Sequence, residues 1–433
     1  MERTLRNRSW VALAAGALLL AACGGDDDDD AGGDTTGATT AGTTADATAA
    51  TTADTETAAG SDTTAGTGTT DSEDTTAGTD TTGTSGGTGG GAVDLSACPD
   101  PLVIQTDWFP EAEHGSLYEM VGDGYSVDVG SKVVRGPLVA GGQETGIDIE
   151  VRSGGPAIGN EPVSVQQYAD DDITLGYANT EGQVLRWSET PVVSVVAPLE
   201  INPQIIFWDP ETYPEIETLA DLGEEGVTIN IFPGGTFADV FVAQGIWTED
   251  QVDPSYDGSP ARFIAEDGGI AQQGFASAEP YKYEHDFEEW GKPVAFQTLH
   301  DAGFEVYSQT LSVRPDKLED LAPCLEAFVP VVQQATVDYI DAPERANAII
   351  IDAVEQYDTF WTYDEGVAQF SVEQQHELGL VGNGPDDTLG NMEEARIQGV
   401  IDQIRDAGLD VPADLTAAEV FTNEFIDESI GMP

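Results

Sequence analysis

The chain has 433 residues, of which 80 are Asp or Glu and 15 are Lys or Arg, so its formal net charge is −65. This balance argues against nucleic-acid binding, because neutralising phosphates requires clustered Lys and Arg, and against a basic patch that lies on anionic lipid. Hydrophobic residues make up 40% of the chain, which allows a sizeable core, whereas three cysteines are too few for a disulfide framework.

Residues 1–22 have the pattern of a secretion signal. Three arginines within the first eight residues are followed by an apolar stretch, 11–22, that is too short to span a membrane. Residues 20–23, Leu-Ala-Ala-Cys, resemble the lipobox of bacterial lipoproteins, in which the cysteine is lipidated and becomes the first mature residue. The resemblance implies that acyl chains on Cys23 anchor the protein to the cell membrane. The alternative is an ordinary signal peptide in which Cys23 has no special role.

Residues 24–92 consist only of Gly, Asp, Ala, Thr, Ser and Glu. Such a segment has no apolar side chains of any size to bury and cannot offset the entropy cost of ordering, so we predict a disordered linker over 23–92. It acts either as a tether that holds a folded domain clear of the cell envelope or as a neutral spacer. The folded part is expected to be 93–433.

Short apolar segments alternate with helix-like ones through much of 93–433. The predicted strands, in chain order, are 103–106, 147–151, 172–177, 191–198, 204–208, 227–232 and 304–313. Helices are predicted between them at 163–168 and 237–244, and apolar residues at helical spacing predict two more at 346–354 and 397–404. Alternating strands and helices predict an α/β fold with mainly parallel sheets.

Cys98 and Cys324 are the cysteines of the predicted folded part. Because thiols of exported proteins tend to oxidise, we predict a disulfide between them. It would join the start of the first strand to a helix expected to begin near Leu325, and in the chain-entropy model it contributes about 4–5 kcal/mol. The alternative is two buried free thiols.

The first predicted strand runs into the sequence Asp-Trp-Phe-Pro-Glu-Ala-Glu-His over 107–114. This sequence is similar to the Asp-Trp-x-Pro-x-x-x-His arrangement of extracytoplasmic binding proteins for thiamine-pyrimidine precursors and of their nitrate-, sulfonate- and taurine-binding relatives. Segments 172–185, 216–229 and 265–284 agree with the same family in order and spacing. The chain departs from the family pattern in an insertion-like segment, 122–146, and beyond about residue 360.

This resemblance implies a two-lobed periplasmic-binding-protein fold of type II with mostly parallel sheets. Its two α/β lobes would be joined by two crossovers and would close on a ligand by hinge motion. We place lobe one at about 99–202 plus 296–433, and lobe two at about 203–295.

Ligands of α/β sheets bind beyond the carboxyl ends of the strands, which selects the candidate site residues. The predicted ligand-binding residues are Trp108, His114, Asn179, Thr180, Gly234, Gly235, Thr236, Glu279 and Tyr281. Trp108 offers an aromatic face, the Gly-Gly-Thr turn offers amide groups at a helix start, and Glu279 offers a carboxylate for a cationic nitrogen. Each also has a structural interpretation, such as a core Trp, a tight turn or a solvated acidic surface. No metal or cofactor is expected.

These features predict a solute-binding lipoprotein that is not an enzyme. It would act as a monomer outside the cytoplasm and deliver a small molecule to an ABC permease and ATPase, with a thiamine-pyrimidine precursor as the candidate ligand. The alternatives are a binder of sulfonate, taurine or nitrate, a non-transport envelope sensor, and an enzyme of pyrimidine synthesis on the same scaffold. The scarcity of Arg disfavours an oxyanion ligand, and the chain has no HExxH, GxSxG or Walker motif.

Overall fold

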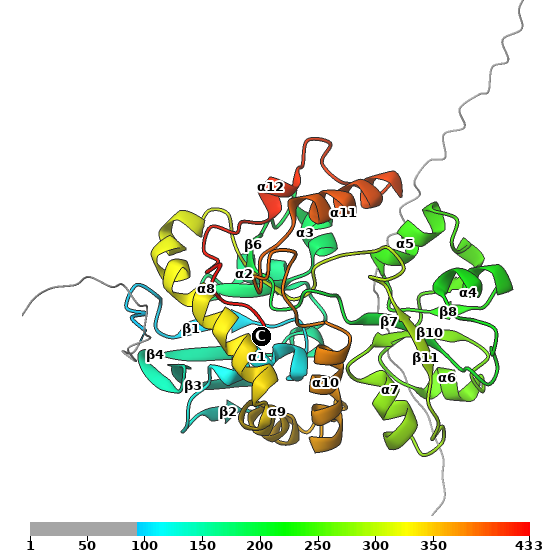
Figure 1. Cartoon of the computed structure of the whole chain (residues 1–433), viewed down its shortest axis with the longest axis horizontal. Helices are drawn as coiled ribbons and strands as arrows, with labels where there is room; N and C mark the ends of the chain where they lie inside the picture. Colours follow the sequence, from blue (N-terminus) through cyan, green and yellow to red (C-terminus); the bar gives the residue numbers. More distant parts are fainter. Residues whose placement is uncertain (1–92) are drawn as a thin grey trace, which may run out of the picture. The chain divides into compact units, whose positions relative to one another are not determined.

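The computed structural model describes residues 93–433. The predicted signal peptide 1–22, the lipidation site Cys23 and the linker lie outside the described residues. Within 93–433, no helix combines the length and the hydropathy that a membrane span requires. Two separate mixed sheets and many helices form this part of the chain, which confirms the predicted α/β fold (Figure 1).

The first sheet has seven strands in the order β2-β3-β4-β1-β5-β12-β6. Its strands are β1 (Leu102–Gln105), β2 (Ser126–Asp128), β3 (Val133–Ala140), β4 (Gln143–Arg152), β5 (Leu175–Ala178), β6 (Val193–Val196) and β12 (Thr310–Val313). Strand β1 pairs in parallel with β4 and β5, whereas β12 runs antiparallel to β5 and β6. We call this sheet and the helices packed on it lobe one.

The second sheet has five strands in the order β11-β7-β10-β8-β9. Its strands are β7 (Gln204–Trp208), β8 (Ile229–Asn230), β9 (Val252–Asp253), β10 (Ala271–Phe275) and β11 (Ala295–Thr298). Strand β8 pairs in parallel with β9 and β10, whereas β7 runs antiparallel to β10 and β11. This sheet and its helices form lobe two.

Both sheets repeat one strand order. Lobe one contains β4-β1-β5-β12-β6 and lobe two contains β9-β8-β10-β7-β11. In lobe one, β1 lies between β4 and β5, and the antiparallel strand β12 lies between β5 and β6. In lobe two, β8 lies between β9 and β10, and the antiparallel strand β7 lies between β10 and β11. In each lobe, that antiparallel strand is the first one formed after the chain crosses from the other lobe, since β7 follows β6 and β12 follows β11. The chain crosses twice, as expected for the two-lobed periplasmic-binding-protein fold.

The helices divide into three groups along the chain. Those between the strands of lobe one are η1 (Ala112–His114), α1 (Gly115–Glu119), η2 (Gly155–Ile158), α2 (Val163–Ala169) and α3 (Thr180–Arg186). Those between the strands of lobe two are α4 (Leu219–Glu225), α5 (Thr236–Ala243), η3 (Glu249–Gln251), α6 (Ala261–Ala265), α7 (Glu279–Tyr281) and η4 (Lys282–Asp286). The carboxyl-terminal group is α8 (Leu318–Asp341), α9 (Glu344–Tyr357), α10 (Glu365–Glu377), α11 (Glu394–Asp406) and α12 (Ala417–Val420).

The insertion-like segment 122–146 forms β2, β3 and the start of β4, which extend the sheet of lobe one. Two predictions differ from the structure. The predicted strand 304–313 is paired only from Thr310, because 304–308 is the crossover segment. Its side chains at Phe304 and Val306 are buried without strand pairing, which explains the strand-like pattern. Helix α8 begins at Leu318 rather than near Leu325.

The carboxyl-terminal helices connect both lobes. Helix α8 packs on α1, and α9 packs there too through the apolar face predicted from its spacing (Figure 1). Helix α11 contacts α3 of lobe one and α5 of lobe two, and its side chains at Ile397, Val400, Ile401 and Ile404 share one core with residues of both lobes. The last third of the chain therefore packs on both lobes.

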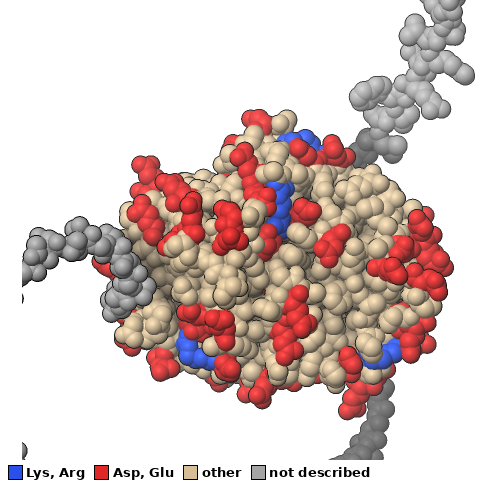
Figure 2. Space-filling model, in the orientation of Figure 1, with Lys and Arg blue, Asp and Glu red and all other residues tan. Residues whose placement is uncertain are grey.

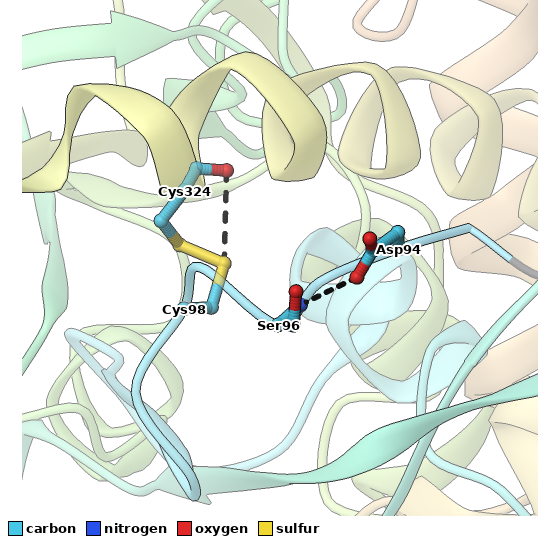
Figure 3. The surroundings of a disulfide bond; sticks show 4 residues. All are labelled: Asp94, Ser96, Cys98 and Cys324. Atoms are coloured by element: carbon cyan, nitrogen blue, oxygen red, sulfur yellow. Dashed lines mark hydrogen bonds between the residues drawn. A yellow bond between two sulfur atoms is a disulfide. The ribbon is translucent and has the colours of Figure 1, made fainter.

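Cys98 and Cys324, the pair expected to bridge, are joined by a disulfide with a Cα–Cα distance of 4.6 Å. The bond links the segment before β1 to helix α8 (Figure 3). Next to it, the backbone N–H of Ser96 donates a hydrogen bond to the carboxylate of Asp94 at 3.0 Å, which closes the turn that leads to Cys98. The start of the described chain is thereby fixed to lobe one.

Candidate functional site

A cavity of about 760 Å³ lies between the lobes, and we call it the cleft. Its wall in lobe one comes from the segment after β1, from the start of α3 and from Gln309 just before β12. Its wall in lobe two comes from the segments that follow β8, β9 and β10. The cleft is therefore at the carboxyl ends of the parallel strands in both sheets, where open α/β sheets bind their ligands.

Aromatic rings from three parts of the chain meet in the cleft. The ring of Trp108, from lobe one, lies edge-on at 6.4 Å from Phe232 of lobe two and at 6.0 Å from Trp361, between the centroids. The ring of Phe232 lies 4.5 Å from that of Tyr256. Gly155 makes room for Trp108, because it has a φ of +55° and a Cβ at this position would lie 2.4 Å from the indole ring. These rings give the cleft planar apolar faces.

Four carboxylates line the cleft close to one another: those of Asp107, Glu111, Glu113 and Glu279. One oxygen of Glu113 accepts a hydrogen bond from the Ser277 hydroxyl, and Oε2 of Glu279 accepts one from the backbone N–H of Phe275 at 2.6 Å. A Cβ on Gly274 would lie 2.7 Å from Cγ of Glu279, so this carboxylate needs glycine there.

Glu111 differs from the other carboxylates in having no hydrogen bond from any described residue. Its Oε1 lies 3.6 Å from Nε2 of His114, and its side chain is only 13% exposed. Burial raises the pKa of Glu111 well above its usual value, and the negative charges of Glu113, Asp107 and Glu279 raise it further. Burial likewise raises the pKa of Glu113 and of Glu279.

No Lys, Arg or His is among the described residues that line the cleft. The nearest ammonium group, Nζ of Lys282, lies 4.1 Å from the ring centroid of Trp361 and donates to the carbonyl of Thr362 at 2.8 Å. It lines an adjoining cavity of about 390 Å³ instead. Arg186 lines a third cavity, of about 250 Å³, which shares Asp107, Trp108 and Asn160 with the cleft.

Five of the nine predicted ligand-binding residues line the cleft, namely Trp108, Gly234, Gly235, Thr236 and Glu279. The other four lie outside its lining. His114 is fully buried below Asp107, with Nε2 3.0 Å from Oδ1. Thr180 exchanges hydrogen bonds with the backbone of Tyr307. The ring of Tyr281 packs against Phe370, 5.6 Å away.

Asn179, the fourth of these, supports a residue that does line the cleft. Its Oδ1 accepts a hydrogen bond from the backbone N–H of Gln309 at 2.9 Å. Gln309 adopts a φ of +52°, an uncommon conformation for a residue with a side chain and one that clusters at functional sites. Its Nε2 donates to Oδ1 of Asp107 at 3.3 Å. Asn179 therefore positions the side of the cleft formed by Gln309.

Sequence reasoning missed Phe360 and Trp361, which line the cleft from the carboxyl-terminal part of the chain. They belong to residues 358–364, which we call the strap. Nε1 of Trp361 donates to the carbonyl of Pro110 in lobe one at 3.2 Å, whereas the Thr362 carbonyl accepts from Lys282 of lobe two. The run of aromatic residues over 360–363, between two helices, was the available signal, since loops commonly carry binding residues.

Over residues 93–433, no group of three or more His, Cys, Asp or Glu side chains is placed to hold a metal ion.

No protein-family model matches the sequence, and no curated protein matches it. Among solved structures, the alkanesulfonate-binding protein of Xanthomonas axonopodis pv. citri, bound to MOPS, aligns at 12% identity with a TM-score of 0.44, over 75% of this chain and 99% of its own. The ligand-binding component of an ABC-type import system from Staphylococcus aureus, with zinc bound, aligns at 12% identity with a TM-score of 0.45, over 76% and 97%. A desulfurization enzyme aligns at 10% identity with a TM-score of 0.42, over 76% and 97%. These sequence identities and TM-scores do not indicate which ligand this chain binds.

Proposed function

We propose that this protein is an extracytoplasmic solute-binding protein that captures a small molecule between its lobes and delivers it to an ABC importer. The observation that carries the proposal is the cleft at the carboxyl ends of both sheets, with walls from both lobes. Its volume, about 760 Å³, is in the range of small-molecule sites. The role needs capture and closure and no chemical step.

The two crossovers supply the motion that such a role requires. A ligand in the cleft would touch Trp108 of lobe one and Phe232 of lobe two together, so binding would favour the arrangement in which both walls are close. The permease would then distinguish the loaded protein from the empty one. The strap, which contacts both lobes at the cleft, would move with this closure.

Anchoring through Cys23 is part of the proposal, and it rests on the lipobox-like sequence alone. The protein would then act as a monomer held at the outer side of the cell membrane. Replacing Cys23 by Ser is expected to release the protein from the membrane fraction into the medium or periplasm. Retention of the Cys23→Ser variant in that fraction would contradict the lipid anchor without affecting the cleft.

A thiamine-pyrimidine precursor is the first ligand to test. Its flat ring fits the aromatic faces of Trp108 and Phe232, and its amino group matches the carboxylates of Glu111 and Glu279. Sulfonate, taurine and nitrate fit less well, because the described lining has no basic side chain to pair with an oxyanion.

The experiment is a binding screen on the full chain, purified in detergent and followed by its intrinsic Trp fluorescence, which Trp108 and Trp361 in the cleft make sensitive to ligand. The probes are 4-amino-5-hydroxymethyl-2-methylpyrimidine, taurine, nitrate and a set of small amines and alcohols. At least one probe is expected to bind with one-to-one stoichiometry and to raise the melting temperature with dose. A folded protein that binds none of them would contradict the solute-binding role.

A further inference from the structure

We infer that the cleft takes its solute as an organic cation, a protonated amine whose N–H groups face the carboxylates and whose carbon skeleton lies against the aromatic rings. This rests on the proposed solute-binding function and adds the charge of the ligand to it. Three independent features of the cleft carry the inference: the sign of its charged groups, its unpaired hydrogen-bond acceptors and its aromatic faces.

The charged side chains that line the cleft all have one sign. They are Asp107, Glu111, Glu113, Glu181, Asp257 and Glu279. The ammonium group of Lys282 donates to the strap carbonyl of Thr362, and the ring of His114 lies beneath Asp107, so neither side chain lines the cleft. A cleft with charges of one sign focuses the field and attracts a ligand of the opposite sign.

Several acceptors in the cleft have no donor among the described residues. The carboxylate of Glu111 accepts no hydrogen bond, and only Oε1 of Glu113 is paired. Gln309 is 4% exposed, its Nε2 is engaged by Asp107, and its Oε1 is buried without a partner. Because a buried acceptor normally finds a donor, these atoms are matched by a ligand that brings several N–H groups.

Aromatic rings line the same space as the carboxylates. Trp108, Phe232, Tyr256 and Phe360 contribute rings from lobe one, lobe two and the strap. The face of an aromatic ring is electron-rich and attracts a cation, and its area buries the carbon skeleton of an amine. Carboxylates for the N–H groups and rings for the body of the ligand together describe an amine site.

An oxyanion has one place to bind in this cleft, the backbone amides at the start of α5 around Gly235 and Thr236. Carboxylates elsewhere in the lining would repel it. Arg186 lines the adjoining 250 Å³ cavity and not the cleft, so the acidic end of a zwitterion would have no basic side chain to pair with in the cleft, and zwitterions serve as negative probes.

The test compares amines with neutral molecules of the same shape, by isothermal titration calorimetry on the full chain in detergent at pH 7.5. The pairs are benzylamine with benzyl alcohol and putrescine with 1,4-butanediol, and taurine, nitrate and glycine betaine are titrated beside them. The amine of at least one pair is expected to bind about tenfold more tightly than its alcohol, and more tightly than the other three.

Two outcomes overturn the inference. An alcohol that binds as well as its amine would show that the charge of the ligand is irrelevant. Tighter binding of taurine, nitrate or glycine betaine than of both benzylamine and putrescine, which lack an acidic group, would show that the cleft selects an acidic group. Either result leaves the solute-binding function standing, whereas a folded protein that binds no probe at all contradicts both proposals.

The variant Glu111→Gln tests the site of the charge. Glu111 has no protein hydrogen bond to lose, so the change removes charge at constant shape and should leave the fold intact. The affinity for the amine is expected to fall about tenfold and that for its alcohol to stay the same. The matched control is Glu326→Gln, an exposed carboxylate on α8 away from the cleft, which should change neither. An unchanged affinity for the amine in Glu111→Gln would contradict the proposal that the protonated amine lies against the carboxylate of Glu111.

Discussion

Carboxylates on the outer surface of residues 93–433 and carboxylates in the cleft are the same chemical groups in opposite circumstances. Asp128 and Asp221 lie at the surface. Hydrogen bonds from backbone N–H groups of a turn lower the pKa of Asp128, and hydrogen bonds from the Thr218 hydroxyl and from backbone N–H groups at a helix start lower that of Asp221. Figure 2 shows such acidic side chains spread over the visible face, with few basic ones between them. Water and local donors stabilise their charge.

The cleft reverses this situation. Burial raises the pKa of Glu111, Glu113, Glu181 and Glu279, and neighbouring carboxylates raise the pKa of Glu111, Glu113 and Glu279 further. The cleft therefore gathers four carboxylates whose pKa is raised, whereas Asp128 and Asp221 at the surface have a lowered pKa. In a chain with a net charge of −65, the composition alone cannot distinguish the two sets, but their surroundings do.

The largest effect should come from the aromatic part of the cleft. Replacing Trp108 by Ala removes the ring that contacts both Phe232 and Trp361, so we expect the affinity for the solute to fall by about 100-fold. The measurement is calorimetric titration of the best probe, together with the free energy of unfolding.

The control for this variant is Trp187→Ala. Trp187 is half-buried and packs against the core shared by the two lobes, outside the cleft lining. It should lower stability and leave affinity unchanged. If Trp108→Ala binds the probe as well as the unaltered protein, the solute does not bind in the cleft. The difference between cleft and surface carboxylates would then have no bearing on solute binding.

Much of the fold follows from periodicity in the sequence. The segments at β1 and β7 were predicted from short apolar runs, and those at α9 and α11 from apolar residues at helical spacing, and the apolar residues of all four are buried in the core. The crossover at 304–308 has the same alternation without strand pairing. The apolar pattern of a segment indicates that its side chains are buried. Whether the segment pairs as a strand depends on which part of the chain packs beside it.

The candidate site was predictable only where it follows a strand. Trp108 and Glu279 come shortly after β1 and β10, so their place at the cleft follows from the topology rule. Phe360 and Trp361 reach the cleft because the strap passes from α9 across both lobes, a path that depends on tertiary packing. The aromatic run over 360–363 marks this loop as a candidate binding segment, but the path of the strap across both lobes decides which cavity it reaches.

A smaller effect is expected from the pH dependence of stability, tested at Glu181. Burial raises its pKa to about 7 in the folded protein, above that of the unfolded chain, so the folded state binds this proton more tightly. The contribution is favourable below the unfolded pKa and is lost as pH rises through about 7. Glu181→Gln should therefore unfold less readily than the unaltered protein at pH 8, by about 1–3 kcal/mol, and equally at pH 4.

The measurement for Glu181→Gln is urea unfolding across this pH range. The cleft carboxylates Glu111, Glu113 and Glu279 shift in the same direction, so the variant should flatten the profile without abolishing its slope. A stability difference that grows as the pH falls would have the wrong sign and would contradict the account of buried, poorly satisfied charge.

The smallest effect should come from the opposite kind of carboxylate, at Asp221. Its carboxylate accepts hydrogen bonds from the Thr218 hydroxyl and from the backbone N–H groups of Glu217 and Thr218 at the start of α4. The Thr218 hydroxyl in turn accepts one from the backbone N–H of Asp221. These bonds lower the pKa of Asp221, so its contribution is present at neutral pH and is lost as pH falls through the lowered value. Asp221→Asn should thus lower the melting temperature slightly at pH 7 and less at pH 3, with solute affinity unchanged.

This effect on stability is opposite in sign to that of Glu181→Gln. Above pH 7, the melting temperatures of the two variants, measured side by side, should therefore differ from that of the unaltered protein in opposite directions. Profiles that diverge in the same direction would mean that surface and cleft carboxylates do not differ in the way their hydrogen bonds and burial require.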